Sequence, residues 1–90
     1  LTRLVPDETR AGQGFNLQPN GLSALAIYAE NHTPNTVVVF GTTALPATYG
    51  SSDWLTVVIP SRLYAHAGRY PVYLRDGSNT SNRLHFVVHP

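Results

Sequence analysis

The most regular alternation of hydrophobic and polar residues lies near the C-terminal end, between Gly68 and Val88. Stretches 70–75 and 84–88 each alternate as a half-buried strand does. Between them lies Asp76-Gly77-Ser78-Asn79, and Gly and Asn tolerate the positive φ of a tight turn. The pattern predicts an antiparallel hairpin whose inward side chains are Tyr70, Val72, Leu74, Leu84, Phe86 and Val88.

Shorter apolar stretches predict further strands at 1–5, 15–18, 22–29, 36–40 and 54–59. We expect a polar loop over 7–14, an irregular crossing segment over 42–49 because of Pro46, and one helical turn within 61–67. Strand patterns separated by turn signals every ~8–12 residues, without a long helix, are typical of a sandwich. The sequence therefore predicts an all-β fold, an immunoglobulin-like antiparallel β-sandwich of about seven short strands.

Composition excludes or disfavours several classes of protein but does not indicate a specific activity. The chain has 90 residues, a net charge of +1 and no cysteine, so disulfides and thiolate chemistry are excluded. All six basic residues are arginines spread along the sequence, which disfavours a nucleic-acid-binding protein. No apolar run reaches the ~18–20 residues that a membrane-spanning helix needs, so no membrane insertion is expected.

Four segments together resemble an IPT/TIG domain: Phe40-Gly41-Thr42, 54–60 (WLTVVIP), 67–74 (AGRYPVYL) and 80–88 (TSNRLHFVV). The resemblance covers nearly the whole chain and implies an immunoglobulin-like sandwich of bacterial type. Members of this family occur in surface proteins, carbohydrate-active enzymes, receptors and Rel-type transcription factors, and they share no catalytic site. We therefore expect residues 1–90 to be one such domain of a larger protein, and the resemblance transfers architecture rather than function.

The sequence nominates no catalytic, cofactor-binding or metal-binding residue. His85 and His89 would lie about 13 Å apart on a strand, which is too far to share a metal ion. No Gly-x-Ser-x-Gly motif is present, and the acidic residues show no paired spacing. We expect neither an enzyme nor a cofactor.

The same alternation places an unusual set of side chains on the outer side of the sheet. If Val38 and Phe40 face the core, Val37 and Val39 face outward beside the hairpin. The outward residues of the hairpin would then be Tyr73, Arg75, His85 and Val87. Because a solvated sheet face is normally polar, we expect this face to dock a neighbouring domain or protein.

An interaction or spacer module of a surface or secreted protein is the function that these patterns favour. The alternative is a carbohydrate-binding module that stacks sugars on Trp54, alone or with Tyr49 or Tyr64. A second alternative is a dimerising or DNA-contacting domain. An extracellular, cell-surface or periplasmic location fits the resemblance, and a cytoplasmic one stays open because the chain has no cysteine.

Overall fold

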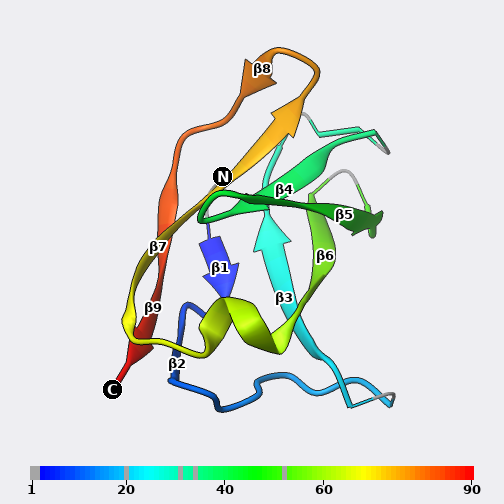
Figure 1. Ribbon diagram of the computed structural model, residues 1–90. Coiled ribbons are helices and arrows are strands. Elements are labelled where there is room, and N and C mark those ends of the chain that lie inside the picture. The colour runs from blue at the N-terminus through cyan, green and yellow to red at the C-terminus, as the bar shows by residue number, and fades with distance from the viewer. Residues whose placement is uncertain (1–2, 20, 31, 34, 52) are drawn as a thin grey trace.

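A computed structural model describes residues 3–19, 21–30, 32–33, 35–51 and 53–90 (Figure 1). This part of the chain forms nine strands and one short 3₁₀ helix, η1, so the fold is all-β as predicted. The elements are β1 (Arg3–Val5), β2 (Glu8–Arg10), β3 (Ser23–Tyr28), β4 (Val37–Phe40), β5 (Thr43–Tyr49), β6 (Trp54–Ile59), η1 (Ser61–Tyr64), β7 (Gly68–Asp76), β8 (Asn79–Thr80) and β9 (Leu84–His89).

The strands follow one another in a single curled sheet that resembles a half-barrel, in the order β1-β3-β6-β5-β4-β7-β9-β2, with β8 beside β7. The sheet changes direction at β5, because residues 43–46 pair with β4 whereas residues 47–49 pair with β6. We call β1, β3 and β6 the first arm, and β4, β7, β9 and β2 the second arm. Figure 1 shows β3 and β6 side by side on one side of the molecule, and β7 and β9 on the other.

Alternate residues of both arms form one hydrophobic core. In β3 the inward residues are Leu25 and Ile27, and in β6 they include Leu55 and Ile59, all fully buried. The second arm contributes Val38, Phe40, Val72 and Phe86. The period of two therefore places Val38, Phe40, Val72 and Phe86 inward as predicted, because one face of each strand is excluded from water.

The predicted hairpin is present, with an interruption that alternation alone does not show. Asp76 pairs with Asn79 across a tight turn at Gly77, which has φ +62°. The register shifts by one residue between Arg75↔Thr80 and Val72↔Leu84, so residues 81–83 form a bulge. Within the bulge the Ser81 hydroxyl accepts a hydrogen bond from the Leu74 backbone N–H at 2.8 Å.

Three sequence predictions are wrong. Residues 8–10 form β2, a short polar strand parallel to β9, where a loop is expected. The segment 42–49 is largely strand β5, because Pro46 lies where the strand passes from one arm to the other and need not continue a ladder. Residues 15–18 are not a strand, although Phe15 is buried against Tyr64 and Phe86, with ring centroids 5.1 and 5.0 Å apart.

Helix η1 and the corner that follows it connect the two arms. The predicted helical turn is found at 61–64, where Tyr64 reaches the core. Beyond η1, the Tyr70 hydroxyl donates a 2.6 Å hydrogen bond to the carbonyl oxygen of His66. The Tyr70 ring also stacks on Phe40, with centroids 5.6 Å apart. This corner thereby fixes the start of β7, which carries Arg69, Pro71, Tyr73 and Arg75 of the surface considered next.

Candidate interaction face

The outward side chains of the second arm form a continuous surface, which we call the outer face. Its registers bring Val37 opposite Pro46 and Arg75, and Val39 opposite Ala44 and Tyr73. On the other side of β7, Pro71 lies opposite His85 and Arg69 opposite Val87. The residues of this surface are Val37, Val39, Ala44, Pro46, Arg69, Pro71, Tyr73, Arg75, Arg83, His85 and Val87.

The structure brings the six residues predicted for this face onto one side of the sheet, but their exposure differs. Val37, Tyr73 and Val87 are half-buried, and Arg75 and His85 are exposed. Val39 is only 3 % exposed, so the prediction that it is open to solvent is wrong. It lies on a central strand between Ala44 and Tyr73, where cross-strand neighbours come close enough to cover a small side chain.

Arg83 is a member of the outer face that the sequence pattern does not identify. Its guanidinium carbon lies 4.4 Å from the centroid of the Tyr73 ring. This is the distance range of a cation–π contact. The bulge at 81–83 sets this position, and a bulge has no signature in the alternation of hydrophobic residues. Arg83 and Tyr73 together form the middle of the outer face.

Charge on the outer face is mostly positive. Arg69, Arg75 and Arg83 are exposed, and none of them forms an ion pair with a carboxylate in the described part of the chain. Two acidic residues lie at the β2 edge, where Glu8 Oε2 is 3.3 Å from His89 Nε2 and Asp7 lines a shallow hollow with His85. A third, Asp76, ends β7 directly after Arg75, and its carboxylate accepts a hydrogen bond from the Thr33 hydroxyl. The fold thus brings three of the six arginines, which are scattered in the sequence, onto one surface.

The aromatic residues proposed for sugar stacking do not form one platform. Trp54 lies on the first arm, directly across from Tyr28, and is 39 % exposed. Tyr64 is 5 % exposed, and its hydroxyl is 2.8 Å from Ser23 Oγ, so its predicted role in sugar stacking is wrong: the core covers its ring. The side chain of Tyr49 lies outside the described part of the structure.

Gly50 gives the Trp54 indole its position. A methyl group at Gly50 would lie 2.6–2.7 Å from three carbon atoms of the indole ring. Contacts this short are not allowed, so the ring packs flat against the glycine backbone only because no side chain is there. Beside this pair, the guanidinium of Arg3 lies 4.8 Å from the centroid of the Tyr28 ring.

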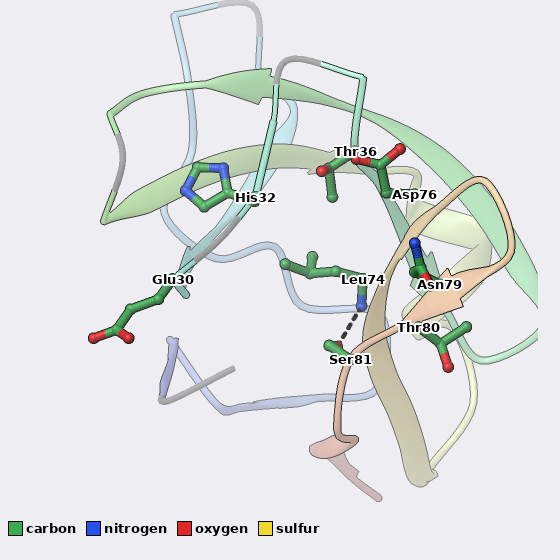
Figure 2. Close-up of a pocket in the computed structure, with 8 residues that line it drawn as sticks. All are labelled: Glu30, His32, Thr36, Leu74, Asp76, Asn79, Thr80 and Ser81. Carbon is green, nitrogen blue, oxygen red and sulfur yellow. Dashed lines mark hydrogen bonds between the residues drawn. The ribbon is translucent and has the colours of Figure 1, made fainter.

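A cavity of about 230 Å³ lies between the segment after β3 and the β7–β8 turn (Figure 2). Figure 2 shows Thr36 and Asp76 close together on one side of it, while the Glu30 carboxylate points away. The Asp76 carboxylate accepts a 2.8 Å hydrogen bond from the Thr33 hydroxyl. The Ser81 hydroxyl accepts from Leu74 and donates to the carbonyl of Asn82 at 2.8 Å, so it serves the backbone of the bulge.

The described residues contain neither a cluster of metal ligands nor a membrane-spanning helix. No group of three or more His, Asp or Glu side chains there is arranged to hold a metal ion. Among the same residues, no helix has the length and apolar character needed to cross a bilayer.

Comparison with known proteins assigns the chain to no family. No protein-family model matches the chain, and no curated protein matches it.

Proposed function

We propose that the chain is a non-catalytic immunoglobulin-like module of IPT/TIG type, and that its outer face docks a neighbouring domain or protein. The observation that carries this proposal is the apolar character of a surface facing away from the core. Val37, Tyr73 and Val87, all half-buried, occupy positions where a solvated antiparallel sheet normally carries polar residues. An apolar surface bordered by polar residues is typical of an interaction site.

The strand order supports an immunoglobulin-like arrangement. In constant-type domains, strands A, B, E and D form one sheet and C, F and G the other. The pairing here reads β1-β3-β6-β5 and then β4-β7-β9, which corresponds to that order if β2 and β8 are additions. The hydrogen bond from Tyr70 to the His66 carbonyl also has the form of the tyrosine corner found at the start of strand F.

A spacer or docking role also agrees with how polar side chains are used. Acyl-transfer chemistry needs a nucleophile beside a base, and the base needs a third group to orient it. Ser81 is engaged by the bulge, Ser23 by the core, and Asp76 by Thr33. We propose that such a module belongs to a larger surface or secreted protein, where it holds neighbouring domains in place.

The test compares proteins retained by three forms of the chain from cells that produce it. The double variant Val37→Gln/Val87→Gln places two neutral polar groups on the outer face, and Val58→Gln makes the same change on the first arm, where Val58 is 42 % exposed. We expect a partner that binds the wild-type chain and Val58→Gln but is lost with the double variant. Equal retention by all three forms would contradict docking through this face.

Carbohydrate binding is the second candidate, because Trp54 is exposed and lies directly across from Tyr28 on the first arm. An indole pinned against Gly50 would offer its other side to the apolar side of a sugar ring. Retardation in gels that contain neutral or acidic polysaccharides tests this candidate. It requires that Trp54→Ala abolish the retardation while Val58→Ala, on the same face, leaves it unchanged.

A further inference from the structure

We infer that the partner of the outer face is a protein surface whose apolar patch is bordered by carboxylates. This inference rests on the proposed docking function and adds the chemical class of the partner. It follows from the way in which the face combines two strips of different character. The apolar strip consists of Val37, Ala44 and Pro46 on β4 and β5. The basic strip consists of Arg69 and Arg75 on β7 and of Arg83 in the bulge that precedes β9.

The basic strip carries three cations that form no ion pair with a carboxylate among the residues the structure describes. Arg69 and Arg75 are both on β7, six residues apart, so their backbones are separated by about 20 Å. Arg83 lies between them, held over the Tyr73 ring. A partner that covers the apolar strip also removes water from these guanidinium groups. A guanidinium that loses water without gaining a carboxylate is costly, so the partner must supply acidic groups along this strip.

A second copy of the chain does not meet that requirement. Two copies packed face to face across a two-fold axis would set the basic strip over either the other copy's basic strip or its apolar strip. Of the carboxylates near this surface, Asp7 and Glu8 lie at its β2 edge, and Glu8 is already beside His89. Asp76, at the end of β7, already accepts a hydrogen bond from Thr33. Neither arrangement pairs Arg69, Arg75 or Arg83 with a carboxylate.

Nucleic acid fits the face less well than an acidic protein does. Single-stranded nucleic acids are bound by rows of open aromatic rings beside basic residues. Tyr73 is the aromatic residue of the outer face, and the Arg83 guanidinium covers its ring. The neighbouring apolar strip is aliphatic and gives bases no ring on which to stack.

The test uses the 90-residue chain and a displayed library of random peptides. Clones are kept if they bind the wild-type chain and Val58→Gln but not Val37→Gln/Val87→Gln, which removes binders that do not use the outer face. Because these substitutions are neutral, they do not bias the selection toward either charge. We expect the retained clones to be enriched in Asp and Glu relative to the starting library.

Binding of those clones should also depend on the arginines. The double variant Arg75→Gln/Arg83→Gln should weaken it about tenfold, and raising NaCl from about 0.05 to 0.5 M should weaken it similarly. Arg62→Gln, which changes an arginine of η1, should have no such effect. Circular dichroism of each variant confirms that the fold is retained.

The other outcomes separate this inference from the docking function on which it rests. Clones that need the outer face but lack acidic residues would overturn the inference and leave the docking function in place. An absence of clones that need this face would contradict both. Two further results would overturn the inference by assigning the face to another occupant: binding of oligothymidylate that is lost with Arg75→Gln/Arg83→Gln, or dimerisation of the chain that is lost with Val37→Gln/Val87→Gln.

Discussion

The Ser23 hydroxyl forms hydrogen bonds to two parts of the chain that lie outside the strands. Ser23 is 1 % exposed, and its Oγ accepts a 3.0 Å hydrogen bond from the Phe15 backbone N–H. The same oxygen lies 2.8 Å from the Tyr64 hydroxyl. One buried serine therefore ties both the segment before β3 and helix η1 to the core.

We predict that Ser23→Ala lowers the free energy of unfolding by about 2–4 kcal/mol, because it leaves a buried N–H and a buried hydroxyl without a partner. Tyr64→Phe, which removes only one of these bonds, should cost less. Urea denaturation measures both effects, with the exposed Ser61→Ala as the control. A loss for Ser23→Ala no larger than that for Ser61→Ala would show that the hydroxyl contributes nothing.

At the corner before β7, we predict that Tyr70→Phe lowers the free energy of unfolding by about 0.5–1.5 kcal/mol. The ring that stacks on Phe40 remains, and only the hydrogen bond to the His66 carbonyl is lost. The matched variant is Tyr73→Phe, which keeps the ring beneath Arg83 and should change stability little. If the two variants are equally stable, the hydrogen bond from Tyr70 to His66 contributes nothing to the free energy of unfolding.

Most of the candidate interaction face can be predicted from the alternation of residues in the sequence. Alternation alone predicts that Val37, Tyr73, Arg75, His85 and Val87 share one face, because a period of two fixes the side of a strand. Alternation gives the side of the sheet on which a side chain lies but not how far its neighbours cover it, so it does not predict that Val39 is buried. It also could not place Arg83, whose position depends on the register shift at the bulge.

At the scale of elements, the turn between β7 and β8 depends on one backbone conformation. Gly77 has φ +62°, and a Cβ there would meet no atom within 4 Å. The cost of a side chain at Gly77 would therefore come from the backbone rather than from crowding. We predict that Gly77→Val lowers the free energy of unfolding by about 1–2 kcal/mol, whereas Gly77→Asn costs less, since Asn tolerates this region. Equal losses in thermal denaturation would contradict this cause.

The sequence predicts those strands whose own residues show an apolar pattern. It does not predict strands that form only because they pair with a neighbouring strand. The segments that became β3, β4, β6, β7 and β9 alternate or are rich in β-branched residues, which reports burial directly. By contrast, β2 is a polar edge strand whose only structural reason is its pairing with β9. Pro46 makes the segment 42–49 look irregular in the sequence, although it forms β5. The sequence gives no sign that the strand changes its pairing partner after Pro46.

At the scale of the whole molecule, β7 and β9 of the curled sheet each have an inner side that faces the core and an outer side that faces away from it. Val72 is fully buried, whereas Val87 faces outward and is half-buried. We predict that Val72→Asp unfolds the chain, because burying an unpaired carboxylate costs several kcal/mol. Val87→Asp should change the free energy of unfolding by less than about 1 kcal/mol. Urea denaturation that finds the two variants equally destabilised would show that β9 has another register.

The most direct test of docking through the outer face is photo-crosslinking in cells that produce the protein. A photoreactive phenylalanine analogue replaces either Tyr73 on the outer face or Thr56 on the first arm, and the covalent adducts are compared. We predict a discrete protein adduct from position 73 that is lost with Val37→Gln/Val87→Gln, and none from position 56. Adducts from position 56 alone, or an adduct from position 73 that survives the double substitution, would contradict docking through this face.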